Sequence, residues 1–192
     1  MKKYIVFGLI VSVALFFGAS HILDKQQNNN AHALYASYES VDTLVQNSTL
    51  VMTCIVSNKE ETIYLNANSK EVKGLSQEVL VKDVLMNNSD TELSKNSTIN
   101  VAYFNEIKST NDWMKISDAN TMKPGKYLLF LNEINNENGT IYVNNTPNHL
   151  YRLKNAAFNT NKSLNKFDNM KSKKLLDISE DDVIKAIENN KE

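Results

Sequence analysis

The sequence predicts a mainly β protein in which short antiparallel strands form a small barrel with flanking helices. The first observation is the segment Met122–Leu131 (MKPGKYLLFL), where a Pro-Gly turn leads into the most apolar stretch outside the N-terminus. Strand side chains alternate between faces, so both faces of this segment would be apolar and covered. The second observation is a slip in the apolar alternation at Lys82-Asp83, within Gln77–Met86. Such a slip indicates a β-bulge, which bends strands in small barrels.

The composition excludes some partners. The 192 residues leave room for one domain plus extensions, and the formal net charge of −1 provides no basic surface for a nucleic acid. The lone cysteine, Cys54, cannot form an intramolecular disulfide, so the core depends on packing alone. Because Cys54 lies within the apolar segment Leu50–Val56, we expect a small buried side chain and not a reactive thiol.

Residues 1–23 have the pattern of a signal peptide or a transmembrane anchor. Two lysines precede an uncharged, apolar run over residues 4–23. A cleaved signal has an apolar region of about 7–15 residues, whereas a spanning helix needs about 20. Small residues at Gly18–Ser20 offer a cleavage site for the first alternative, and in the second the lysines stay cytoplasmic. Both alternatives place the remaining chain outside the membrane, either anchored by one N-terminal span or secreted.

Three further regions follow this segment. Polar residues 24–36 suit a tether, residues 37–154 would form the barrel domain, and residues 155–192 would form a polar linker and a C-terminal helix. Asp and Asn interrupt the lysines of residues 155–174. This mixture favours a solvated linker over a lipid-binding segment.

The barrel domain begins with a short helix that Ser40 caps and that ends by Ser48. The polar stretch Asn58–Ser76 looks like an excursion that holds at most a short strand at Thr62–Leu65. Asn138-Gly139 favours a tight hairpin turn. The expected strands are Thr49–Ser57, Gln77–Met86, Thr98–Phe104, Met122–Leu131, Thr140–Val143 and His149–Leu153.

A second helix is expected at the C-terminus. Ser179 has the position of an N-cap, and Asp182 three residues later completes a capping pattern. Val183, Ile184 and Ile187 form an apolar stripe. We expect this stripe to pack on the barrel and to close one of its mouths.

The segment Asn105–Thr121 contains the only tryptophan, Trp113, next to Met114. A tryptophan in a polar insertion suits a binding anchor, and these two residues are the candidate binding site. The alternative, which the base rate of such insertions favours, is a lid folded back onto the core.

Motifs for catalysis or metal binding are not found. The three histidines, His21, His32 and His149, are too far apart in sequence for a usual metal site, and no nucleophile elbow or phosphate-binding loop is present. We therefore expect no cofactor and no metal. Ser, Asp and Lys are plentiful, so an enzyme with an unrecognised site stays an alternative.

The order of the core motifs also carries a family resemblance. The predicted helix precedes the apolar strand Leu50–Val56, the pattern V-x-V-x-x-V-L begins at Val79, and G-x-Y-L-L-F-L begins at Gly125. Over Ser40–Leu153 this order resembles small exported or membrane-anchored, largely uncharacterised proteins of Gram-positive bacteria. Their strand pattern is similar to the OB-like barrel of netrin-like and metalloproteinase-inhibitor domains, so the resemblance implies an OB-like barrel.

Two departures limit what the resemblance implies. Members often have Lys-Gly after the V-L pair, where this chain has Met86-Asn87. The inhibitor domains depend on an N-terminal cysteine and a disulfide framework, which this chain lacks. The resemblance therefore implies the fold and not metalloproteinase inhibition.

Three functions are consistent with these features. The first is a non-enzymatic binding module of the bacterial envelope, attached to the membrane through its N-terminal segment, with a protein, peptide or envelope component as partner. The second is an envelope hydrolase. The third is an inhibitor or immunity factor for a secreted protease or toxin, with a protruding loop at Asn58–Ser76 or Asn105–Thr121.

Overall fold

The computed structural model describes most of the chain after residue 37. The described residues are 38–67, 70–109, 112–115, 121–136, 139–145, 150–155, 157–171, 175 and 177–191. The predicted membrane segment and tether, and His149, lie outside them. Within the described ranges, no helix has the length and hydropathy needed to cross a bilayer.

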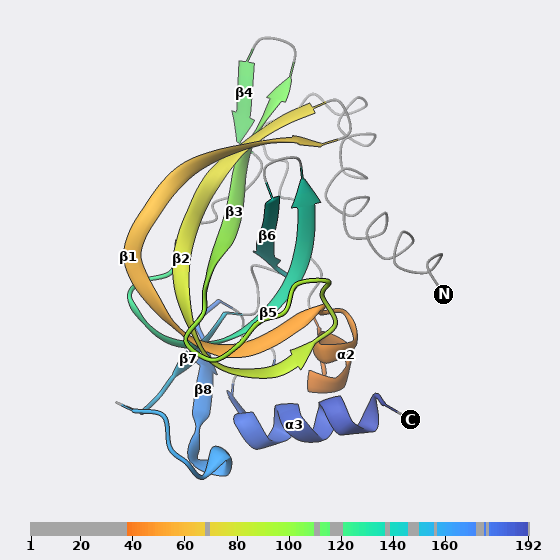
Figure 1. The fold of residues 1–192 in the computed structure, drawn as a ribbon, viewed down its shortest axis with the longest axis vertical. Helices are drawn as coiled ribbons and strands as arrows, with labels where there is room; N and C mark the ends of the chain where they lie inside the picture. Colours follow the sequence, from red (N-terminus) through yellow and green to blue (C-terminus); the bar gives the residue numbers. More distant parts are fainter. Residues whose placement is uncertain are drawn as a thin grey trace.

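The described residues form a mainly β domain, as predicted, with a short helix before the first strand and a longer helix at the C-terminus (Figure 1). The helices are α2 (Val41–Gln46) and α3 (Glu180–Asn189), and a 3-10 turn, η1, spans Lys162–Leu164. The strands are β1 (Leu50–Ala67), β2 (Lys70–Asn87), β3 (Thr98–Ser109), β4 (Asp112–Lys115), β5 (Gly125–Asn136), β6 (Gly139–Asn144), β7 (Tyr151–Leu153), β8 (Lys166–Asn169) and β9 (Asp177–Ser179).

Five of the strands form a partial ring in the order β1-β2-β3-β6-β5, which the pairing of β1 with β5 closes. The prediction of a purely antiparallel sheet is wrong, because β3 and β6 are parallel. A closed ring with an odd number of strands cannot alternate direction throughout, so one parallel pair is unavoidable. This pair is short, with Val101 opposite Tyr142 and Ala102 opposite Val143.

One of the irregularities in the strand pairing lies where the sequence predicts a bulge. Cys54 lies opposite Val81 while Thr53 lies opposite Asp83, so Lys82 is an extra residue in β2. The predicted bulge is therefore confirmed. The hairpin between β5 and β6 is confirmed as well, and its Gly139 has a φ of +121°, which glycine adopts without strain.

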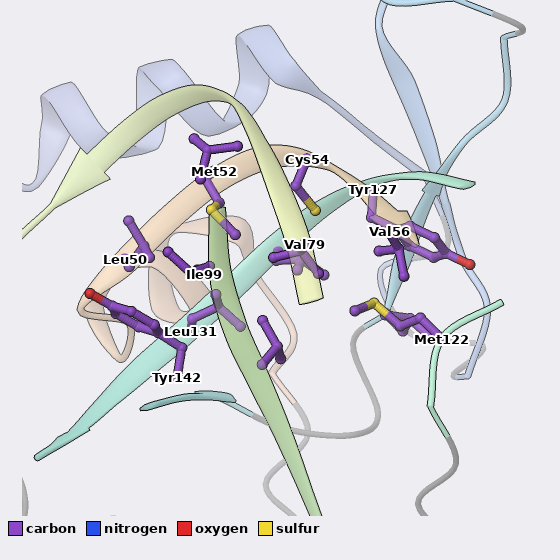
Figure 2. Close-up of a cluster of buried hydrophobic side chains, with 14 of the residues drawn as sticks. Leu50, Met52, Cys54, Val56, Val79, Ile99, Met122, Tyr127, Leu131 and Tyr142 are labelled. Atoms are coloured by element: carbon purple, nitrogen blue, oxygen red, sulfur yellow. The ribbon is translucent and has the colours of Figure 1, made fainter. Parts of the chain in front are cut away.

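The interior of the ring holds the main apolar core, to which all five strands contribute alternate side chains (Figure 2). Leu129 and Leu131 of β5 point inward and are fully buried, and Cys54 is a buried apolar side chain, as predicted. Met122 lies in this core just before β5, and Leu93 of the loop between β2 and β3 packs against it.

The helices cover the outside of β1 and β5. Leu128 and Phe130, which alternate with the interior residues of β5, share a second core with Val183 and Ile187 of α3. Helix α3 therefore packs on the barrel, as predicted, but against its outer face and not over a mouth. Its N-terminus has the predicted capping box between Ser179 and its third residue.

Two stretches that the sequence assigns to polar connections are part of the sheet. Asn58–Ser76 is not an excursion, because β1 and β2 continue through it and pair up to Ala67 and Lys70. Residues 155–171 contain β8, which pairs with β7 and β9. Phe167 of β8 is fully buried, so this region is anchored to the outer core and is not only a solvated linker.

Candidate binding surface

The two predicted binding residues lie on β4, which pairs with the end of β3. Trp113 is opposite Lys108 and Met114 is opposite Ile107. Their exposed fractions are 36% for Trp113 and 44% for Met114. Since successive strand residues face opposite sides, the structure separates the two residues onto different faces. The described residues around Trp113 thus form a strand with exposed side chains.

β4 belongs to a four-stranded ribbon that extends past the ring. The pairing of β1 with β5 ends at Val56, and the pairing of β3 with β6 ends at Ala102. Beyond these points the ends of the four strands pair only with one another in the order β1-β2-β3-β4 among the described residues. In Figure 1 the ends of β1 and β2 arch over the top of the ring, and β4 extends above it. We call this part the ribbon. It comprises Ser57–Ala67, Lys70–Ser76, Phe104–Ser109 and Asp112–Lys115.

One face of the ribbon carries two aromatic rings. Tyr64 is on β1 and Trp113 is on β4, with two strands between them. Three strand spacings correspond to about 14 Å of backbone separation in a flat sheet. The ring centroids are nevertheless 6.0 Å apart with an interplanar angle of 56°. The ribbon therefore curls toward this face and makes it concave.

Charged side chains lie beside the aromatic pair. The ammonium groups of Lys73 and Lys108 are 5.9 Å and 5.7 Å from the centroid of the Trp113 ring, within the range of cation–π contact. Lys73 Nζ donates to Glu106 Oε2 at 2.7 Å, and Lys108 Nζ donates to Glu71 Oε2 at 2.8 Å. The bond to Glu106 raises the pKa of Lys73. Lys73 is therefore charged at neutral pH.

We call this surface the aromatic face. It comprises Tyr64, Glu71, Lys73, Glu106, Lys108 and Trp113. Its two ion pairs each combine one ammonium group with one carboxylate, and Lys115, opposite Glu106 on β4, lies on the same face. From the sequence, at most a short strand is expected around Tyr64. The contact between this tyrosine and Trp113 depends on the curl of the ribbon.

The opposite face of the ribbon is apolar and largely covered. Val72 and Ile107 are opposite each other on β2 and β3, and they form a third, smaller core with Phe104. Gly74 allows β2 to approach the backbone of β3 closely, because a Cβ at this glycine would lie 2.3 Å from the carbonyl oxygen of Tyr103. Met114 lies on this side, next to Ile107.

Other parts of the described chain offer less for ligand binding. A shallow depression of about 310 Å³ is lined by Asn87, Glu92, Leu93 and Ser94. The described ranges bring no three His, Cys, Asp or Glu side chains together as a metal site. Its lining has one carboxylate, of Glu92, and one hydroxyl, of Ser94, with no hydrogen bond between these two described residues.

The most buried carboxylate of the C-terminal region also has a structural explanation. Glu180 at the start of α3 accepts from Lys162 Nζ at 2.8 Å and from Asn165 Nδ2 at 2.6 Å, one bond for each carboxylate oxygen. Lys162 also pairs with Asp83 of β2. With one bond on each oxygen, this carboxylate connects α3 with η1, and Lys162 connects both with β2.

Comparison of the chain with protein-family models, with curated proteins and with solved structures finds no match. The interpretation of the site therefore depends on its geometry.

Proposed function

We propose that this protein is a non-enzymatic binding module that acts outside the membrane, held there by its N-terminal segment or secreted. The observation that carries the proposal is the exposed pair of aromatic rings on the ribbon. Tyr64 is 54% exposed and Trp113 is 36% exposed. Large aromatic side chains at this exposure, on an element outside the main core, are typical of interaction sites.

An OB-like barrel is the finer description of the fold that we propose. An OB fold is a five-stranded, partly open Greek-key barrel. The ring order β1-β2-β3-β6-β5, its closure by β1 and β5, and its short parallel pair support this description. The binding elements of OB folds include the connection between the first two strands, and the part of the ribbon formed by β1 and β2 has this position.

The compartment can be tested by thiol labelling, because the cysteine already present in the chain is buried and should give no signal. Cys54 is fully buried, so a membrane-impermeant maleimide should not label the native full-length chain. The variant Glu188→Cys places a thiol on the exposed side of α3. We expect this variant to be labelled in intact cells. Labelling only after the cells are permeabilised would overturn the proposed compartment.

The binding site can be tested with two matched double variants of the full-length chain in mild detergent. Tyr64→Ala/Trp113→Ala removes the aromatic pair. Leu164→Ala/Met170→Ala removes two other exposed large side chains, each 52% exposed, that lie outside the ribbon. We expect only the first variant to lose co-sedimentation with detergent-washed cell envelopes. Equal retention of both variants would contradict binding through the ribbon.

An inhibitor of a secreted protease or toxin is the second candidate. The two loops predicted to protrude in that case, Asn58–Ser76 and Asn105–Thr121, both contribute to the ribbon. An inhibitor would present this element to a single soluble target and not to the envelope. This candidate would be favoured if the unmodified chain does not co-sediment with envelopes and does inhibit a secreted enzyme.

A further inference from the structure

We infer that the aromatic face binds an uncharged polysaccharide chain. The inference rests on the proposed function, because it names the ligand class of the same surface. It is carried by the combination of two exposed aromatic rings with two internally neutralised ion pairs on one concave face.

The charges on the face argue against an anionic ligand. Each lysine beside Trp113 already donates to a glutamate, Lys73 to Glu106 and Lys108 to Glu71. A phosphate or carboxylate ligand would have to displace one glutamate or approach both. Surfaces that bind phosphate chains have an excess of unpaired positive charge, which the two ion pairs of this face do not provide.

The same ion pairs suit hydroxyl groups. The bonds seen between described residues use Oε2 of Glu106 and of Glu71, which leaves Oε1 of each carboxylate to accept from a ligand hydroxyl. Each ammonium group has three N–H donors, one of which is used in the ion pair. A sugar diol needs a donor and an acceptor close together, and an ammonium–carboxylate pair provides both without a net charge.

The aromatic rings suit the other property of a sugar. A pyranose ring has an apolar C–H face that packs flat against an aromatic ring, whereas its hydroxyls point sideways. Tyr64 and Trp113 are tilted by 56° to each other, so they present two differently oriented surfaces at a spacing of 6.0 Å. A chain of sugars that twists from one residue to the next could contact both rings.

The chain provides its own reporter for this site, because Trp113 is the only tryptophan. Full-length protein in mild detergent is titrated with cellohexaose and chitohexaose, two neutral oligosaccharides, and with the anionic hexagalacturonate, while tryptophan fluorescence is recorded. We expect a saturable change with at least one neutral probe below about 1 mM, the range of weak specific sites. We also expect the affinity to stay constant between low and high salt, because no charge is neutralised.

The variant Tyr64→Ala keeps the reporter and removes one ring. We expect it to weaken binding about tenfold, the loss typical of one stacked aromatic ring. The control Leu164→Ala removes a side chain of similar exposure and should leave the affinity unchanged. Circular dichroism of both variants should match that of the unmodified chain. Unchanged affinity in Tyr64→Ala would overturn the inference.

Other outcomes separate this inference from the proposed function. Binding of hexagalacturonate alone, weakened by salt, would show an anionic ligand and would overturn the inference. The same holds if no neutral probe changes the fluorescence, or if protease treatment of the envelopes abolishes co-sedimentation while glycosidase treatment does not. In each of these cases the proposed function survives if the Tyr64→Ala/Trp113→Ala variant still loses co-sedimentation, and it fails if that variant is retained.

Discussion

Replacing Gln77 with methionine would test how the ring is closed at the end from which the ribbon extends. The Gln77 side chain is 2% exposed and makes three hydrogen bonds. Its Nε2 donates to the carbonyl oxygens of Ser57 and Met122, at 2.9 Å and 2.8 Å, and its Oε1 accepts from Met122 N–H at 2.9 Å. One amide thus connects β2, the point where β1 leaves the ring, and the segment before β5.

Methionine keeps the length of the side chain and removes all three bonds. Each such bond contributes about 1 kcal/mol net, so the expected loss in the free energy of unfolding is about 3 kcal/mol. The carbonyl group and the N–H of Met122 that lose their partner stay buried, and the Ser57 carbonyl is partly buried, which raises the loss. The greater apolarity of methionine offsets part of it.

The assay is urea unfolding of the full-length chain, followed by circular dichroism for the sheet and by Trp113 fluorescence for the ribbon. The control Glu78→Gln alters the next residue, whose carboxylate pairs with Lys59 at the surface. Surface pairs contribute little, so the control should differ from the unmodified chain by less than about 1 kcal/mol. A loss below about 1 kcal/mol for Gln77→Met would refute the reasoning. The three hydrogen bonds of the buried amide would then contribute no more free energy than the same groups gain from water in the unfolded chain.

Three further outcomes follow from the described contacts. Gly74→Ala should lower the free energy of unfolding by about 3 kcal/mol or more, because the new Cβ would overlap backbone atoms of β3, and an unchanged urea midpoint would contradict this. Ser179→Ala should cost about 1 kcal/mol at neutral pH. Hydrogen bonds from the Ser179 hydroxyl and N–H lower the pKa of Asp182, so their stabilisation is present above the ordinary pKa of a carboxyl and is lost as the pH falls through the lowered value. Acid titration of thermal stability should therefore show a smaller decrease in Ser179→Ala than in the unmodified chain. Burial raises the pKa of the Cys54 thiol, so Ellman's reagent should react with it only at the rate of unfolding, and rapid reaction of the native protein would contradict the structure.

Features set by local chemistry could be predicted from the sequence. The alternation in β5, the bulge at Lys82, the hairpin before Gly139 and the capping box at Ser179 each depend on a few neighbouring residues. Their positions in the structure agree with the sequence to within a few residues.

Features set by contacts between distant segments could not be predicted in this way. β1 pairs with both β2 and β5, and its pattern is apolar on both faces whichever strands flank it. β8 has four residues, too few for a periodic signal, so its buried Phe167 gave no indication of a strand. The same limit explains the outer position of α3, because an apolar stripe shows that a helix is covered and not which face of the barrel covers it.

The candidate site contains one residue that the sequence identifies and one that it does not. Trp113 was identifiable because it is a single large aromatic residue in a polar stretch. Tyr64 was not, since its segment alternates polar and apolar residues weakly and lies about 50 residues away; the contact requires four strands to pair and curl. Met114, grouped with Trp113 by sequence proximity, lies on the other face of β4.

The distribution of stabilising contacts connects this architecture to the proposed function. The ring interior and the outer core contain the fully buried side chains, whereas Lys73, Glu106, Lys108 and Glu71 have side chains that are 31–42% exposed. Half-exposed ion pairs contribute little to stability. The aromatic face is therefore held in place by the apolar face beneath it and not by its own charges. Substitutions on the aromatic face should consequently change binding while the free energy of unfolding stays nearly constant, and substitutions beneath it, such as Gly74→Ala, should change both.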